Sequence, residues 1–132
     1  MSIFADSGYY VALLLQTDQM HERAMEITRQ LQQPIITTAW VMTEVANTFS
    51  APRLRGAFLS LLDDLQADPS VRVILPEREL FEHGIHLYRS RPDKSWSLTD
   101  CISFIVMERE GIREALTGDH HFEQAGFKAL LQ

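Results

Sequence analysis

Four acidic residues stand out because the sequence around each of them is apolar. Asp6 and Asp119 each follow a short apolar run, Glu44 lies among apolar neighbours, and Asp100 begins an apolar segment. A carboxylate in such surroundings needs a partner, because an unpaired buried charge is costly. Grouped carboxylates are the ligands that hard divalent cations prefer. Metal binding is therefore the chemistry that these residue types could support if the fold brings them together.

Each of the four residues also has an ordinary structural interpretation. Asp6 and Asp119 could be turn or cap residues, and Glu44 could face solvent on a helix. Asp100 could be a first-turn acid that the helix dipole favours. For each residue taken alone, the sequence leaves the structural alternative open. An explanation must, however, account for all four acids in one fold.

Apolar runs alternate along the chain with segments of helical periodicity. The short runs predict strands at residues 3–5, 34–37, 71–75 and 115–117, and an edge strand at 127–131. Apolar residues at three- and four-residue steps predict helices near residues 9–15, 19–32, 40–49, 58–65, 76–88 and 98–110. This alternation indicates an α/β fold with a parallel sheet and helices on both faces. Sites in such sheets form beyond the carboxyl ends of the strands, where we expect Asp6 and Asp119.

The ends of two helices carry further signals. Asp18 is a good N-cap for the helix near 19–32, and Gly111 is a plausible C-cap for the helix that ends near residue 110. Either Ser97 or Thr99 could cap the start of that last helix.

Length and composition predict one globular domain over residues 1–132. The 132 residues are 45% apolar and 23% charged, which is enough apolar sequence for one core and rules out general disorder. The single cysteine, Cys101, excludes an internal disulfide. The longest apolar run, residues 9–15, is far shorter than the roughly 20 residues that span a bilayer. We therefore expect a cytoplasmic protein with no membrane association.

The net charge of −6 does not point to a nucleic-acid-binding protein, which is usually basic. Acidic residues gathered in a metal site, however, raise the negative count. Setting the four acids apart from the 18 acidic residues leaves 14 against 12 basic residues, a balance of −2. The bulk charge is therefore no strong objection to an RNA substrate.

Four short motifs resemble those of a known family. They are Phe4-Ala5-Asp6-Ser7, Thr43-Glu44-Val45-Ala46-Asn47, Ser97-Leu98-Thr99-Asp100-Cys101 and Thr117-Gly118-Asp119-His120-His121-Phe122. In this order they resemble the acidic motifs of PIN-domain ribonucleases, and most closely those of VapC-type toxins from bacterial toxin–antitoxin pairs. The segments 18–21 and 121–127 are similar as well, so the resemblance covers essentially the whole chain.

This resemblance implies a three-layer α/β/α sandwich with a central, mostly parallel sheet of about five strands. It implies a metal-dependent endoribonuclease that hydrolyses RNA phosphodiester bonds, with Asp6, Glu44, Asp100 and Asp119 around one or two Mg²⁺ or Mn²⁺ ions. Asp93 is a further acid that could replace or supplement a ligand. The expected partners are an RNA substrate, a cognate antitoxin protein and a second copy of the chain in a homodimer.

A metal would also relieve a physical conflict among these acids. Two carboxylates roughly 5 Å apart repel each other by about 3 kcal/mol at an effective dielectric near 20. Without a cation, several converging acids would be strained or one of them would stay protonated. A bound cation turns this repulsion into attraction, and it acidifies water and offsets charge on a phosphate.

Other residues have supporting roles in this interpretation. Ser7 and Thr117 could hydrogen-bond the ligand carboxylates. RNA phosphates need positive contacts, and the candidates are Arg53, Arg55, Arg89, Arg91 and Lys94. The alternative for these five residues is an ordinary solvated loop face, and His120 and His121 are expected to be surface histidines.

Two other functions are compatible with the sequence. The same fold could be a non-catalytic PIN-like module that binds RNA or protein. A receiver-like or phosphatase-like domain could use Asp6 as a phosphate acceptor, although Asp6 is followed by Ser7 and Gly8 and lacks the second Asp of a common phosphatase pattern.

Overall fold

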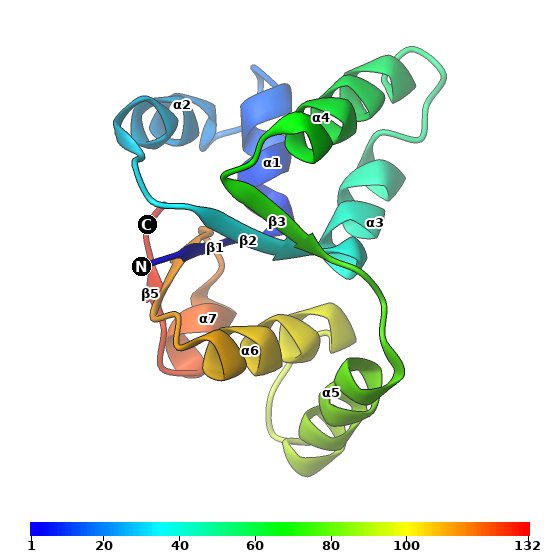
Figure 1. Cartoon of the computed structure of the whole chain (residues 1–132), viewed down its shortest axis with the longest axis vertical. Helices are drawn as coiled ribbons and strands as arrows, with labels where there is room; N and C mark the ends of the chain where they lie inside the picture. Colours follow the sequence, from blue (N-terminus) through cyan, green and yellow to red (C-terminus); the bar gives the residue numbers. More distant parts are fainter.

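A computed structural model describes all residues of the chain, 1–132. Its centre is a five-stranded sheet in the order β3-β2-β1-β4-β5 (Figure 1). The strands are β1 (Ile3–Ala5), β2 (Ile35–Thr38), β3 (Val71–Ile74), β4 (Glu114–Leu116) and β5 (Lys128–Ala129). Every pairing between neighbouring strands is parallel. The prediction of a mostly parallel sheet of about five strands is therefore confirmed.

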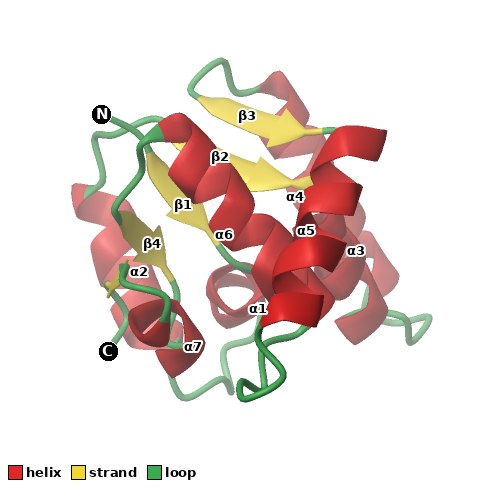
Figure 2. Cartoon of the chain, turned by 90° about the horizontal axis from the view of Figure 1, so that it is seen from below, coloured by secondary structure: helices red, strands yellow, loops and turns green.

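Helices cover both faces of this sheet. The seven helices are α1 (Ser7–Leu14), α2 (His21–Gln30), α3 (Ala39–Thr48), α4 (Arg55–Ala67), α5 (Arg78–Ser90), α6 (Leu98–Glu110) and α7 (His120–Gln124). Figure 1 shows α1 to α4 on one side of the sheet and α5 to α7 on the other, and Figure 2 shows the same layers from below. The predicted α/β/α sandwich is confirmed. None of the helices combines the length and the apolar character that crossing a membrane requires.

Helix α6 begins and ends where the sequence predicts. Its N-cap is Ser97, whose hydroxyl accepts from the Asp100 amide while the Asp100 carboxylate accepts from the Ser97 amide, a reciprocal capping box. Its C-cap is Gly111, with the left-handed φ of 69° that glycine tolerates. Apolar residues of α6 pack into the core, and Cys101 is a fully buried thiol. Strong local signals at both ends thus place the helix that carries Asp100.

The structure differs from the prediction at α2 and α7, and the edge strand expected at residues 127–131 is shorter, with β5 at Lys128–Ala129. Helix α2 begins at His21, and Asp18 does not cap it: the Asp18 carboxylate instead accepts from the Met20 amide at 2.8 Å, in a turn before the helix. Helix α7 was not predicted, because five residues are too few to display helical periodicity. Its N-cap is Asp119, whose carboxylate accepts from the His121 amide at 2.8 Å.

Candidate metal centre

Asp6 and Asp119 meet beyond the carboxyl ends of the adjacent strands β1 and β4. The strands pair Ala5 with Leu116, so the residues that follow them are neighbours. The Thr117 hydroxyl donates to Asp6 Oδ2 at 2.9 Å and accepts from the Asp119 amide at 3.0 Å. Asp6 occupies the N-cap position of α1 but makes no side-chain capping bond, so its carboxylate is not used to start the helix. One hydroxyl therefore links the Asp6 carboxylate to the backbone of Asp119.

Glu44 comes from the same helical layer as α1. It lies on α3, which follows β2 directly because the Thr38 hydroxyl caps the helix by accepting from the Val41 amide. The Ser7 hydroxyl, in the first turn of α1, donates to Glu44 Oε1 at 2.9 Å. Ser7 is the neighbour of Asp6 in the chain, so this bond holds the half-buried Glu44 beside the first acid.

Asp100 is brought to the same place by α6, and a histidine joins it to Asp119. Asp100 is 8% exposed, and its Oδ2 accepts from the Ser97 amide at 3.1 Å. His121 Nδ1 lies 3.2 Å from Asp100 Oδ2 and 3.3 Å from Asp119 Oδ1. The expectation that His121 is a surface histidine is wrong, because its side chain is only 19% exposed, whereas that of His120 is 67% exposed.

The pKa values of the two most buried acids show that they affect one another. The pKa of Asp6 is raised to about 7, chiefly by burial; the charges of Asp100 and Glu44 add to this rise, and the hydrogen bonds that Asp6 accepts oppose it. Burial likewise raises the pKa of Asp100. Asp119 adds to that rise, while the hydrogen bond from the Ser97 amide and His121 oppose it. The four acids thus form one electrostatic cluster.

No lysine or arginine neutralises this cluster. None of the ion pairs in the protein joins a lysine or arginine to any of the four acids, whose partners are hydroxyls, amides, His120 and His121. Carboxylate oxygens without a cationic partner are suited to Mg²⁺ or Mn²⁺, which take oxygen ligands. The donor set therefore fits a hard divalent cation. Asp119, His120 and His121 also offer ligand atoms within 4.8 Å of one another, a grouping that sequence adjacency alone could not establish.

The acid in the α5–α6 loop lies apart from the cluster. Asp93 is exposed and accepts two hydrogen bonds from the Arg91 guanidinium, at 3.0 and 2.9 Å. Arg91 lowers the pKa of Asp93 to about 2. Because Asp93 is engaged with Arg91, the structure gives no support to its replacing or supplementing a ligand.

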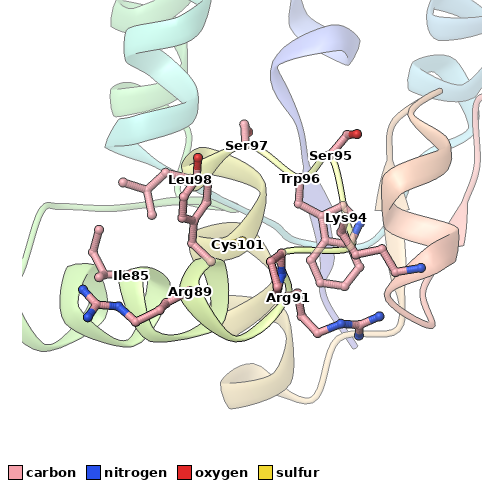
Figure 3. Close-up of a pocket in the computed structure, with 11 residues that line it drawn as sticks. Ile85, Arg89, Arg91, Lys94, Ser95, Trp96, Ser97, Leu98 and Cys101 are labelled. Atoms are coloured by element: carbon pink, nitrogen blue, oxygen red, sulfur yellow. The ribbon is translucent and has the colours of Figure 1, made fainter.

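The candidate RNA-contacting residues fall into two places. Arg53 and Arg55 follow α3, and the Arg55 side chain donates to the Ser50 carbonyl at 2.8 Å. Arg89, Arg91 and Lys94 line an open pocket of about 1030 Å³ between α5 and the start of α6 (Figure 3). This second group is the one that shares a pocket with Ser97, the cap residue bonded to Asp100.

The fold and the site together define a parallel α/β protein with a cluster of four carboxylates at the carboxyl edge of its sheet. The chain belongs to the PIN domain family, whose model matches residues 3–128. No curated protein sequence matches the chain.

Several solved structures share this fold, among them those of two proteins. VapC20 of Mycobacterium tuberculosis, a toxin that cleaves the sarcin–ricin loop, superposes with a TM-score of 0.86 at 24% identity over 95% of both chains. FitAcB of Neisseria gonorrhoeae superposes with a TM-score of 0.68 at 15% identity, over 98% of this chain and 95% of that one. At these identities the likeness establishes the architecture of the chain.

Proposed function

We propose that the protein is a metal-dependent endoribonuclease that hydrolyses phosphodiester bonds in RNA, with Mg²⁺ or Mn²⁺ as its cofactor. The observation that carries this proposal is the cluster of four acids around Asp6, which no lysine or arginine neutralises. Membership of the PIN domain family supports it. Burying such a cluster is costly without a cation, so the arrangement is best explained by a site built to hold one.

The residues would divide the work as follows. Asp6, Glu44, Asp100 and Asp119 are the proposed ligands and catalytic residues. Ser7 and Thr117 orient two of these carboxylates through hydrogen bonds of 2.9 Å each. A divalent cation held there supplies charge neutralisation at the phosphate and lowers the pKa of the attacking water. The protein itself supplies the position of the oxygen ligands.

We further propose that residues 1–132 form one PIN-like domain that acts as the toxin of a type II toxin–antitoxin system. The toxin activity of VapC20, which has the same fold over 95% of both chains, supports this proposal. A cognate antitoxin protein, a homodimer and a cytoplasmic location follow as expectations for such a toxin acting on cellular RNA.

The deciding experiment is cleavage of a cellular RNA pool by the purified protein in Mg²⁺, in Mn²⁺ and in chelator. We expect cutting in metal only, and a loss of about 100-fold or more in Asp100→Asn, the size of effect seen when one electrostatic element of an active site is removed. The neutral amide keeps the shape of the side chain. The matched control is Asp64→Asn, which changes an exposed acid on α4 outside the cluster.

The outcomes separate the hypotheses. A folded Asp100→Asn protein that cuts at the wild-type rate would overturn the assignment of this residue. A folded wild-type protein that binds RNA but cuts none in either metal, after any co-purified inhibitor has been removed, would favour a non-catalytic binding module.

A further inference from the structure

The pocket beside the acid cluster has the dimensions of a ligand site. Its volume of about 1030 Å³ is at the upper end of the range for small-molecule pockets, which is ample for one nucleotide. The walls come from the second half of α5, the loop that follows it and the first turn of α6 (Figure 3). Ile85, Tyr88 and Arg89 line it together because residues three and four apart share one helix face.

The pocket is cationic, although the chain carries a net charge of −6. Arg89, Arg91 and Lys94 line it, and no acidic residue does. Arg89 takes part in no ion pair, and the Lys94 ammonium is 3.9 Å from Asp93, at the limit of one. Figure 3 shows Arg89 extending to one side of the pocket and Lys94 to the other. The two side chains could therefore contact phosphates on either side of a bound nucleotide.

The pocket also offers planar groups on which a base could stack. Tyr88 is 54% exposed, a high value for a large aromatic side chain. Trp96 is buried, with its indole N–H donating to the Gln124 side chain at 3.0 Å. The guanidinium of Arg91 lies 5.1 Å from the centre of the Trp96 ring and is held by Asp93. Arg91 is thereby a fixed planar surface, and both tyrosine rings and guanidinium planes stack on bases.

The first turn of α6 connects this pocket with the acid cluster. Ser97 lines the pocket, and its backbone amide donates to Asp100 Oδ2 at 3.1 Å. The first turn of α6 therefore borders both sites. An RNA chain that follows this turn would contact both the carboxylates and the cationic pocket.

We propose that the pocket between α5 and α6 binds an unpaired nucleotide of RNA next to the bond that is cut. In this proposal Tyr88 stacks on the base, and Arg89 and Lys94 contact the flanking phosphates. The nucleotide must be unpaired, because a base inside a duplex already has both faces stacked and cannot reach an aromatic side chain. The proposal deepens the nuclease function above, but the binding that it predicts does not require cleavage.

The test is equilibrium binding of a fluorescent single-stranded RNA decamer of mixed sequence to Asp100→Asn protein in chelator, so that no cleavage intervenes. We expect Tyr88→Ala to raise Kd by about 5- to 150-fold, the effect of losing one stacked base. We expect Arg89→Ala to weaken binding. It should also reduce the slope of log Kd against log salt by about one, because one fewer counterion is released on binding. The same decamer annealed to its complement should bind at least about 10-fold more weakly.

The matched controls come from the same helix. Phe81→Ala removes an exposed aromatic side chain of α5, and Arg78→Ala removes an exposed arginine of α5; neither lines the pocket. Both should leave Kd and its salt dependence unchanged.

The results distinguish this proposal from the nuclease itself. If Tyr88→Ala and Arg89→Ala bind the single strand like their controls, or if duplex and single strand bind equally, the pocket proposal is overturned even if the wild-type protein cuts RNA. If the pocket variants lose binding and the wild-type protein cuts no RNA in metal, the pocket proposal is upheld and the nuclease proposal is overturned.

Discussion

His121 Nδ1 lies 3.2 Å from Asp100 Oδ2, which joins α7 to the first turn of α6. The same nitrogen is 3.3 Å from Asp119 Oδ1, so the imidazole stands between two carboxylates that are proposed metal ligands. The ring is the only side chain that forms an ion pair or hydrogen bond with both acids. It occupies a place where the two carboxylates would otherwise face each other.

Removing this ring should destabilise the metal-free protein and increase its response to a cation. We expect His121→Ala to lose about 1–3 kcal/mol of stability in chelator, because the buried Asp100 and the half-buried Asp119 both lose the imidazole that lies between them. Mn²⁺ should then raise the melting temperature of the variant more than that of the wild type, because the cation no longer competes with the imidazole. Differential scanning calorimetry in chelator and in Mn²⁺ measures both effects. The control is His120→Ala, and a smaller Mn²⁺ shift in His121→Ala would show that the ring assists metal binding instead.

The buried Asp6 carboxylate should make the metal-free protein less stable as the pH rises. Its pKa is about 7 in the folded protein against an ordinary value of 3.8, so stability falls progressively as the pH rises from about 4 to about 7. Asp6→Asn removes this charge and should be about 2–4 kcal/mol more stable than the wild type at pH 8 in chelator. The gain should shrink towards zero near pH 4. Urea unfolding at several pH values measures it, and a gain that does not change with pH would contradict the explanation.

The cap of α6 should contribute measurably to stability. Ser97→Ala removes the hydroxyl that accepts from the Asp100 amide at 2.9 Å, so we expect a loss of about 1 kcal/mol. Hydrogen exchange at the Asp100 amide should accelerate. Ser97→Asn should retain most of the stability, because asparagine caps as well as serine. The control is Ser95→Ala, an exposed serine two positions earlier; equal losses in Ser95→Ala and Ser97→Ala would contradict the role of the cap.

The packing of α5 against α6 should depend on the absence of a side chain at Gly84. A Cβ there would overlap Ile102 Cγ1 on α6, so Gly84→Ala should lose about 1–3 kcal/mol. Gly56→Ala on α4 is the matched control, because a Cβ there meets nothing within 4 Å and alanine favours the helix by about 0.5–1 kcal/mol. Urea unfolding should therefore show a lower free energy of unfolding for Gly84→Ala and a higher one for Gly56→Ala. The double variant Gly84→Ala with Ile102→Ala should lose less than the sum of its two single changes.

Much of the fold could be predicted because its signals are local. Helix α6 has its N-cap and its C-cap within one residue of its ends, and its apolar spacing lies between them. Strand β1 is a short apolar run followed directly by Asp6, and β4 ends in the apolar pair Ala115 and Leu116 shortly before Asp119. The parallel pairing of the two strands follows from the alternation with helices. Helix α7 was not predicted, because a helix of five residues is too short to show the apolar spacing that indicates a helix.

The candidate site divides in the same way. The types and order of Asp6, Glu44, Asp100 and Asp119 were visible in the sequence, because each interrupts apolar surroundings. The contacts that bring these acids together were not visible in the sequence, because they join distant positions. The hydrogen bond from Thr117 to Asp6 spans 111 positions, and that between His121 and Asp100 spans 21. Sequence alone therefore treated His121 as a surface residue and left Asp93 as a possible ligand.

What the sequence determined by itself is the set of elements and the acids at their ends, since capping bonds and periodicity act over a few residues. Only the tertiary structure decided which charged groups lie together. Asp93 pairs with Arg91 in its own loop, whereas His121 on α7 contacts Asp100 on α6. The physical reason is that the interaction between two charges depends on their separation and burial in space. The order of strands in the sheet, with β1 beside β4, sets both quantities for Asp6 and Asp119.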